Sequence, residues 1–371
     1  MSEIPGKPRA RNSALAAAAF ILAATFAPAT PAAAASNPLA TGATTIHLSP
    51  AFVKALKRGG VKLTALAPLT VKGTTIVLPV EGGELDSDSG RGVIDNAGRL
   101  KLKSPRGAAI LRNFVLKTSS TPLYAVVTGA QLKLTTGSGL SLTHDGFGSD
   151  VTYKTLKLTQ NFAQRLNTKL HLKGVFSQGL AFGQVQSKTQ PASFAIAPKG
   201  GVTFTPNAET FAKLAKRNVS INPVFPAELS SGSFNLPLVS LGTIAPDALS
   251  GTVRSGGSME MLQLQSESYG KITMHEIWFN LGEKTATCEL NIEPSPPYRG
   301  KTLMTAILTL TTSGDSVSAN PSSRTLSVSG ITVGLNPVLA ATFNEVLAKG
   351  EGEVFKAGEP LGTISFSATA E

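Results

Sequence analysis

The four histidines are the side chains of this chain most suited to acid–base chemistry, but their surroundings form no catalytic set. Serine-type hydrolysis needs a nucleophile, a base and an orienting acid, and the sequence contains no Gly-x-Ser-x-Gly. His47 lies in an alternating segment, His144 in a Thr-His-Asp-Gly turn, and His171 after a predicted helix. His275 lies next to Glu276, so an enzyme remains an alternative hypothesis. It would require a nucleophile in the same cleft as these two residues. We predict that the protein is not an enzyme.

Metal and redox chemistry find equally little support in the residue spacing. Cys288 is the single cysteine, so no internal disulfide can form. It alternates with Ala286 and Leu290, which predicts a buried, unreactive thiol. The stretch Glu81–Ser89 has carboxylates at alternate positions but lacks the closing Glu of a calcium loop, so we expect a solvated loop. The residues themselves predict no metal and no cofactor.

A nine-residue stretch occurs twice and organises the rest of the chain. Val175–Gly183 and Val354–Gly362 both read Val-Phe, two residues, Gly, two residues, a large apolar residue and Gly. The spacing fits neither a dinucleotide-binding nor a Walker loop. We therefore expect a turn in which glycine supplies a positive φ.

The segments before this stretch also recur in the same order, which predicts a duplicated domain. Thr45–Pro50 and Gly201–Pro206 both run into Ser/Thr-Pro, so we expect short helices capped by Ser49 and Thr205. Gly59 and Asn218 should end these helices in the left-handed conformation. The predicted organisation is copy one at 44–188, a linker at 189–200 and copy two at 201–371.

Composition and alternation predict the fold class. The chain has 36 Gly, 23 Pro and only 15% charged residues, and apolar residues alternate with polar ones in short segments such as Arg99–Lys103. We predict an all-β fold with short helices, arranged as two tandem homologous antiparallel β-sandwich or barrel-like domains.

The two predicted helices share a basic face. Basic residues occur at i, i+3 and i+4 in each helix, where they lie side by side. One interpretation is a solvated helix face, and the other is a contact for a polyanion, presented once per domain. The candidate contacts are Lys54, Lys57, Arg58, Lys213, Lys216 and Arg217.

The first 35 residues have the anatomy of a secretory signal peptide: a basic start, an apolar run from Ala14 to Ala27, and small residues before Ser36. An uncleaved anchor is the alternative. Without 1–35 the chain keeps 31 basic and 22 acidic residues, a net charge of +9. We expect a secreted or envelope location, no transmembrane span in the mature chain, and anionic envelope polymers or lipids as partners. Aromatic residues do not accompany the basic runs, so we do not expect nucleic acid.

The feature order resembles the haem-transport-associated (HtaA-like) domains of exported actinobacterial proteins. The resemblance is carried by Gly92–Leu100, by Gly251–Met259 and by the two Val-Phe stretches. It implies repeated β-rich modules that capture haem through a tyrosine ligand. Phe52 and Phe211 stand at the starts of the predicted helices, so no ligand is carried over. The tyrosines are unmatched between the copies: Tyr124, Tyr153, Tyr269 and Tyr298.

Two functions follow from these observations. The first is a non-catalytic, envelope-associated binding or structural protein that contacts anionic surface polymers. The alternative is an HtaA-like carrier of haem or lipid.

Overall fold

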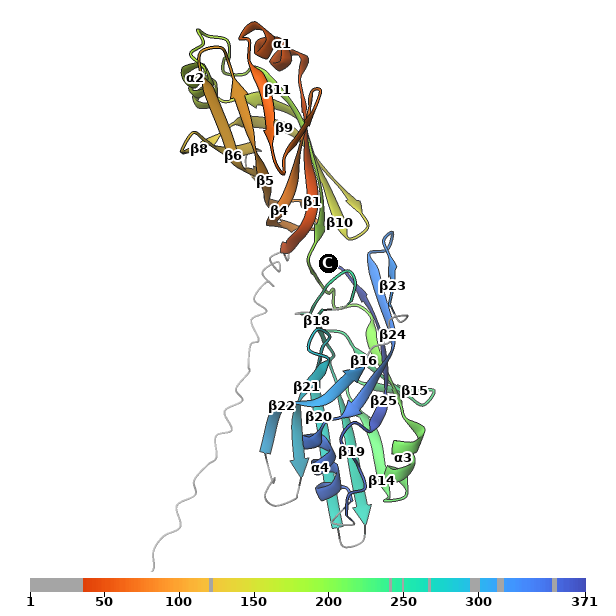
Figure 1. Cartoon of the computed structure of the whole chain (residues 1–371). Helices are drawn as coiled ribbons and strands as arrows, with labels where there is room; N and C mark the ends of the chain where they lie inside the picture. Colours follow the sequence, from red (N-terminus) through yellow and green to blue (C-terminus); the bar gives the residue numbers. More distant parts are fainter. Residues whose placement is uncertain are drawn as a thin grey trace, which may run out of the picture. The chain divides into compact units, whose positions relative to one another are not determined.

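The structure, a computed structural model, describes residues 36–119, 123–239, 242–248, 250–265, 268–293, 301–311, 317–348 and 352–371. The expected signal peptide, 1–35, lies outside these residues. Within them the chain forms two curled antiparallel sheets and four short helices (Figure 1), so the predicted fold class is confirmed. The first sheet runs from Ser36 to Pro191 and the second from Phe194 to Thr369. Strands also occupy part of the expected linker at 189–200.

The first domain is the sheet of β1 to β11 with helices α1 and α2. Its strands follow the order β8-β7-β6-β5-β4-β1-β11-β10-β9, with β2 on β5 and β3 on β4. The elements are β1 (Ser36–Leu48), α1 (Pro50–Arg58), β2 (Lys62–Leu66), β3 (Thr70–Lys72), β4 (Thr75–Asp86), β5 (Gly92–Lys103), β6 (Ala108–Lys117), β7 (Leu123–Val127), β8 (Ala130–Lys133), β9 (Thr135–Asp145), β10 (Gly148–Leu158), α2 (Gln160–Lys169) and β11 (Ala181–Pro191).

The second domain is the sheet of β12 to β25 with helices α3 and α4. Its order is β12-β17-β18-β20-β21-β22-β24-β25-β13-β16-β15, and β14 and β23 pair with β19 and β24. The elements are β12 (Phe194–Ala195), β13 (Gly201–Pro206), α3 (Ala208–Ala215), β14 (Val219–Val224), β15 (Glu228–Ser230), β16 (Ser233–Pro237), β17 (Thr243–Ile244), β18 (Gly251–Arg254), β19 (Ser258–Gln265), β20 (Ser268–Asn280), β21 (Thr285–Glu293), β22 (Lys301–Thr311), β23 (Val317–Asn320), β24 (Thr325–Leu335), α4 (Pro337–Val346) and β25 (Pro360–Thr369).

The strands form where the sequence alternates, because every second side chain enters a core. On β21, Ala286, Cys288 and Leu290 are all fully buried, so the predicted burial of the thiol is confirmed. Each domain has its own apolar core, one built around Phe162 and the other around Phe343. The enclosed hollow in the first core has a volume of only about 10 Å³, so that core is packed with side chains.

The two domains share one pairing scheme, which supports duplication. β1 lies between β4 and β11, as β13 lies between β16 and β25, and β2 pairs with β5 as β14 pairs with β19. The Ala67–Pro68 and Phe225–Pro226 peptides are both cis. Gly98 and Gly257, both with positive φ, press against the residues that follow those prolines. A side chain at either glycine would collide with this backbone.

In copy two, the helix that follows the first strand begins two residues later than predicted. Ser49 caps α1 as predicted, but Asn207, not Thr205, caps α3, because its side chain accepts from the amides of Glu209 and Thr210. The left-handed residue after α1 is Gly60 rather than Gly59, which has a φ of −83°. Its counterpart in copy two is Asn218, as predicted.

The repeated Val-Phe stretch is held by an asparagine from the preceding helix. Asn167 on α2 donates to the Phe176 carbonyl and accepts from the Phe176 amide, at 2.7 and 3.1 Å. Asn344 on α4 does the same with Phe355, at 2.8 and 2.9 Å. The first glycine of each stretch, Gly179 or Gly358, has the expected positive φ.

The acidic stretch Glu81–Ser89 is not the solvated loop that the sequence predicts. Glu81–Asp86 belongs to β4, and only the turn that follows is free of the sheet. Asp86 closes that turn by accepting from the amide and the hydroxyl of Ser89. Burial acts to raise the pKa of Asp86, but these donors and Arg91 outweigh burial and hold it below its usual value.

Candidate functional site

Charge is divided unequally between the two domains. Residues 36–191 contain 19 Lys and Arg but 7 Asp and Glu, a formal charge of +12. Residues 192–371 contain 12 Lys and Arg and 15 Asp and Glu, a formal charge of −3. Over residues 36–371, the net positive charge therefore comes from the first domain alone.

Within the first domain the acidic residues are absent from one end. Its carboxylates lie between Glu81 and Asp95 or in Asp145–Asp150, toward the β4–β5 and β9–β10 turns. The opposite end carries α1, α2 and the β5–β6 turn (Figure 1). The segments that build it, 47–80, 96–144 and 151–191, contain no Asp or Glu. An anion would approach this end without meeting a like charge.

Opposed cations line the outer face of the sheet next to this end. Arg99 on β5 lies directly across from Arg112 on β6, and Lys62 on β2 lies directly across from Lys103 on β5. These four side chains are exposed, and none has an ion pair with another described residue. Like charges opposite one another destabilise a sheet unless something neutralises them. With Lys101 between the two pairs, we name these five residues the basic face.

A hollow opens on the basic face. It has a volume of about 370 Å³ and is lined by Arg99, Arg112, Ile110 and Thr128, among others. Side chains two apart on one strand are separated by about 7 Å. Arg99, Lys101 and Lys103 thus form a row of cations that suits a linear polymer with regularly spaced anions.

The second domain lacks the basic face. Arg99 and Ser258 each follow a matching glycine, and Arg112 and His275 each precede a matching residue with positive φ. Arg99 and Arg112 of copy one therefore correspond to Ser258 and His275 of copy two, which also pair with each other. Lys101 corresponds to Glu260, which lies 3.9 Å from Lys271. The Lys62–Lys103 pair is replaced by Ser220 opposite Leu262. Equivalent positions of one fold therefore carry five cations in one copy and none in the other.

A second hollow lies where α1, α2 and the β5–β6 turn meet. Its volume is about 220 Å³, and its lining includes Gly59, Arg106, His171, Leu172 and Lys173. Ser104 fixes the turn by donating to the carbonyl of Leu170, the residue that ends α2, at 2.7 Å. We name Arg106, His171 and Lys173 the helical-end pocket.

The predicted helix contacts differ between the two copies. On α1, Lys54, Lys57 and Arg58 are exposed, and Arg58 also donates to the Val175 carbonyl at 2.8 Å. On α3, Lys213 is only partly exposed and lies 2.6 Å from Glu359.

The residues that follow Lys213 complete the α3 face. Lys216 is exposed, and Arg217 donates to the Lys213 carbonyl at 3.0 Å. Burial acts to raise the pKa of Glu359, but the hydrogen bonds from Lys213, the Lys356 amide and Thr210, together with the Lys213 charge, outweigh burial and leave that pKa below its usual value. The α3 face is thus partly neutralised, whereas the α1 face is not.

The residues held open for an enzyme do not assemble. His275 Nδ1 lies 2.7 Å from the Ser258 hydroxyl, but Glu276 pairs with Arg254 at 2.6 Å instead of orienting the imidazole. The Ser258–His275 contact stands where the first domain has its opposed arginines. Among the described residues, no group of three His, Cys, Asp or Glu side chains could hold a metal ion.

The structure places no tyrosine on α1 or α3, the helices that follow the first strand of each described domain. Phe52 is buried on α1 with its ring 4.9 Å from that of Phe182, and Thr210 stands at the matching place on α3. Tyr153 is buried and donates to the Thr118 carbonyl at 3.0 Å, and burial raises its pKa. Among the residues that line the helical-end pocket, His171 has the one side chain of a type that commonly binds iron.

The basic face could have been found in the sequence. Arg99–Lys103 predicts a strand with one apolar face, and its other face is wholly cationic. The long acid-free segments were a second signal. What the sequence could not show is which strands lie beside this row, and therefore that the cations oppose one another.

The solved structures that are similar to this chain include two domains of HtaA from Corynebacterium glutamicum. The crystal structure of its N-terminal domain is 19% identical, covers 47% of this chain and 99% of that domain, and has a TM-score of 0.35. The corresponding values for its C-terminal domain are 16%, 48%, 99% and 0.36. The resemblance to HtaA-like domains is thereby confirmed, as a likeness of fold. No known family and no curated protein matches the sequence. None of the helices described here could cross a membrane.

Proposed function

We propose that this protein is a non-catalytic binding protein whose first domain holds a linear polyanion on the basic face. The observation that carries this proposal is the pair of opposed cations, Arg99 with Arg112 and Lys62 with Lys103, without an acidic partner. Retaining such pairs costs stability in the free protein. A polymer that bears phosphate or carboxylate groups would neutralise them, and displaced counterions would add a favourable, salt-dependent term.

The proposed role of α1 is to extend the basic face. Gly60 lies against Pro105 of the β5–β6 turn, so the end of α1 is next to the end of the cationic row. Lys57 and Arg58 would then continue the polyanion contact around the helical end. The α3 residues have a smaller proposed role, because Lys213 already has a carboxylate partner.

The test exchanges the opposed arginines for the residues of copy two. Inorganic polyphosphate is the probe, and binding to the full-length protein is measured by calorimetry over a range of salt concentrations. Arg99→Ser with Arg112→His should weaken binding at least tenfold and lower the salt slope by about 1 to 2. The same variant should unfold at a higher denaturant concentration, because an opposed like-charge pair is gone.

The matched control removes two exposed cations elsewhere on the first domain. Lys154→Ser with Lys157→Ser on β10 changes the net charge equally but leaves the basic face intact. If both double variants weaken binding equally, net charge alone explains the affinity and the proposed site is wrong.

Haem is the second candidate ligand, and His171 is the observation that favours it. The imidazole lies in the helical-end pocket with Arg106 and Lys173, whose charges suit the two propionates of haem. Haem would supply an iron centre that a neutral imidazole can bind. The hollow of about 220 Å³ is smaller than the usual small-molecule pocket of roughly 300–1,000 Å³, so the ring would lie mainly outside it.

Haemin titration separates the two candidates. A Soret shift that is present in the parent protein and lost in His171→Ala would favour the haem carrier. No shift in the parent protein would remove haem and leave the polyanion. Polyphosphate binding should be unchanged in His171→Ala, since the basic face does not include this residue.

A further inference from the structure

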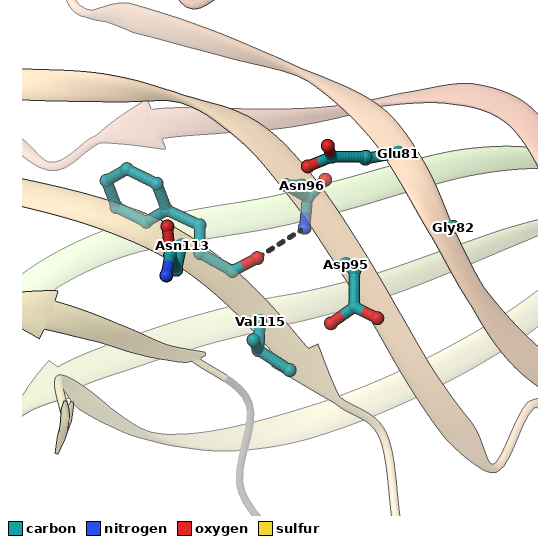
Figure 2. A pocket seen from close by; sticks show the side chains of 7 residues that line it. Glu81, Gly82, Asp95, Asn96, Asn113 and Val115 are labelled. Atoms are coloured by element: carbon teal, nitrogen blue, oxygen red, sulfur yellow. Dashed lines mark hydrogen bonds between the residues drawn. The ribbon is translucent and has the colours of Figure 1, made fainter.

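A third hollow on the first domain has the opposite chemistry to the basic face. It lies between β4, β5 and β6, has a volume of about 310 Å³, and is lined by Glu81, Gly82, Asp95, Asn96, Asn113 and Val115 together with the Phe114 backbone (Figure 2). The carboxylates of Glu81 and Asp95 are exposed, and neither has an ion pair with another described residue. The hollow therefore presents negative charge that the described chain leaves without a counterion.

A buried oxygen in the same hollow lacks a donor. Asn96 is 2% exposed, and its Nδ2 donates to the carbonyls of Ile94 and Phe114 at 3.1 and 3.5 Å. Its Oδ1 is buried and has no hydrogen-bond partner. In Figure 2 this oxygen lies toward the Glu81 side chain, which can only accept a hydrogen bond when ionised. A buried acceptor without a donor destabilises the protein, so a ligand that donates here gains from a group that is already desolvated.

The second domain shows what occupies the equivalent place when the chain fills it. Asp95 pairs with Val115 as Arg254 pairs with Trp278, and Asn113 and Glu276 are the matching positive-φ residues. Arg254 lies 4.6 Å from the centre of the Trp278 ring and 2.6 Å from Glu276. A guanidinium thus sits on this part of the second sheet, clamped between an aromatic ring and a carboxylate.

In copy one, these positions carry an acidic residue and a small apolar residue instead. Asp95 replaces the arginine, Val115 replaces the tryptophan, and the space of these two large side chains is left open. Ser255, the counterpart of Asn96, has its hydroxyl satisfied by the Ile277 carbonyl at 3.2 Å. The unsatisfied oxygen and the unpaired carboxylates are therefore features of copy one, where the chain supplies no cation.

From these observations we propose that the hollow of copy one binds a guanidinium group supplied by another molecule. A guanidinium is planar, always charged, and carries five N–H donors, which match two carboxylates and one amide oxygen. A calcium ion would need six to eight oxygen ligands. The basic face would repel a bare cation in the surrounding solution, so binding relies on these directed hydrogen bonds.

The test uses ethylguanidinium as the probe and the full-length protein labelled with ¹⁵N. Amide shifts of Asp95, Asn96 and Asn113 should saturate with ethylguanidinium. Tetramethylammonium, which has the charge but no donors, should leave them unchanged. Glu81→Gln with Asp95→Asn should lower the ethylguanidinium affinity at least tenfold. Saturable calcium binding at these amides without ethylguanidinium binding would overturn the proposal.

Two further variants test whether ethylguanidinium binds in this hollow. Asp88→Asn removes an exposed carboxylate on the neighbouring turn and should leave affinity unchanged. The triple variant Asp95→Arg, Asn113→Glu and Val115→Trp, which introduces the residues of copy two, should abolish ethylguanidinium binding while the remaining spectrum stays that of a folded protein. Unaltered affinity in that filled variant would place the ligand elsewhere and refute the assignment.

The source of the guanidinium is decided by a second probe. A Gly-Gly-Arg-Gly-Gly peptide presents the same group on a polypeptide. Affinity at least tenfold above that of ethylguanidinium would identify an arginine of a protein partner, whereas equal affinity would identify a small guanidinium compound. The polyphosphate experiment does not involve these residues, so the two proposals stand or fall separately.

Discussion

Removing the asparagine clamp of one copy should unfold that copy selectively. In Asn344→Ala the Phe355 amide and carbonyl lose their partners, and the Val354 amide loses a bond of 2.9 Å. Phe355 is fully buried, so its two backbone groups are left without donors or acceptors from water. Each such group costs about 1–3 kcal/mol. We expect the free energy of unfolding of the second domain to fall by about 3 kcal/mol.

Trp278 makes the effect measurable in the whole protein. It is the single tryptophan of the chain and lies on β20 of the second domain, so its fluorescence reports that domain alone. With a urea slope of about 2–3 kcal/mol per molar, a loss of 3 kcal/mol moves the fluorescence midpoint down by about 1 M. Asn344→Asp should be no milder, because it loses the donor and points a charge at the Phe355 carbonyl.

The matched variant is Asn167→Ala, which breaks the same clamp in copy one. It should lower the midpoint of the circular dichroism signal and leave the Trp278 transition in place. The reasoning is refuted if Asn344→Ala leaves the fluorescence midpoint within about 0.2 M of the parent value, which at these slopes is about 0.5 kcal/mol. An equal shift of Trp278 by both variants would show that the two cores do not unfold separately.

Three further outcomes follow from local geometry. Gly98→Ala and Gly257→Ala should each cost more than about 2 kcal/mol by denaturant unfolding, since the new Cβ would meet the backbone nitrogen of the facing residue at 2.7 and 2.5 Å. Glu359→Gln should lower stability by up to about 1 kcal/mol at neutral pH. Because the folded-state pKa of Glu359 is lowered, its stabilisation is present above the ordinary pKa of 4.5 and disappears as the pH falls through the folded value, so parent and variant midpoints should converge in acid. Burial raises the pKa of Cys288 to about 12, so iodoacetamide should label it only in denaturant, and labelling of the native protein would contradict the packing of β21.

The sequence predicts the fold well because the signals for it are local. Alternation marks the strands, and the Ser49 cap marks the start of α1. The sequence analysis missed the Asn207 cap because Thr205-Pro206 is an equally good local signal for the start of a helix. The pairing of Pro206 with Gly362 shows that Pro206 belongs to the strand instead. Local preferences cannot choose between two possible caps that lie two residues apart, whereas sheet register can.

The binding surfaces were less predictable because they depend on contacts between distant segments. The sequence marks Lys57 and Arg58 as neighbours on a helix. It cannot show that Arg99 faces Arg112, since this follows from the register of β5 and β6. It also cannot show that Lys213 meets Glu359, which is 146 residues away.

Because charge is divided unequally, the two domains should respond differently to a polyanion. A polyanion would attract the first domain, which carries +12, and repel the second, which carries −3, so we expect the first contact to form with the first domain. This attraction would act over distances of about one Debye length.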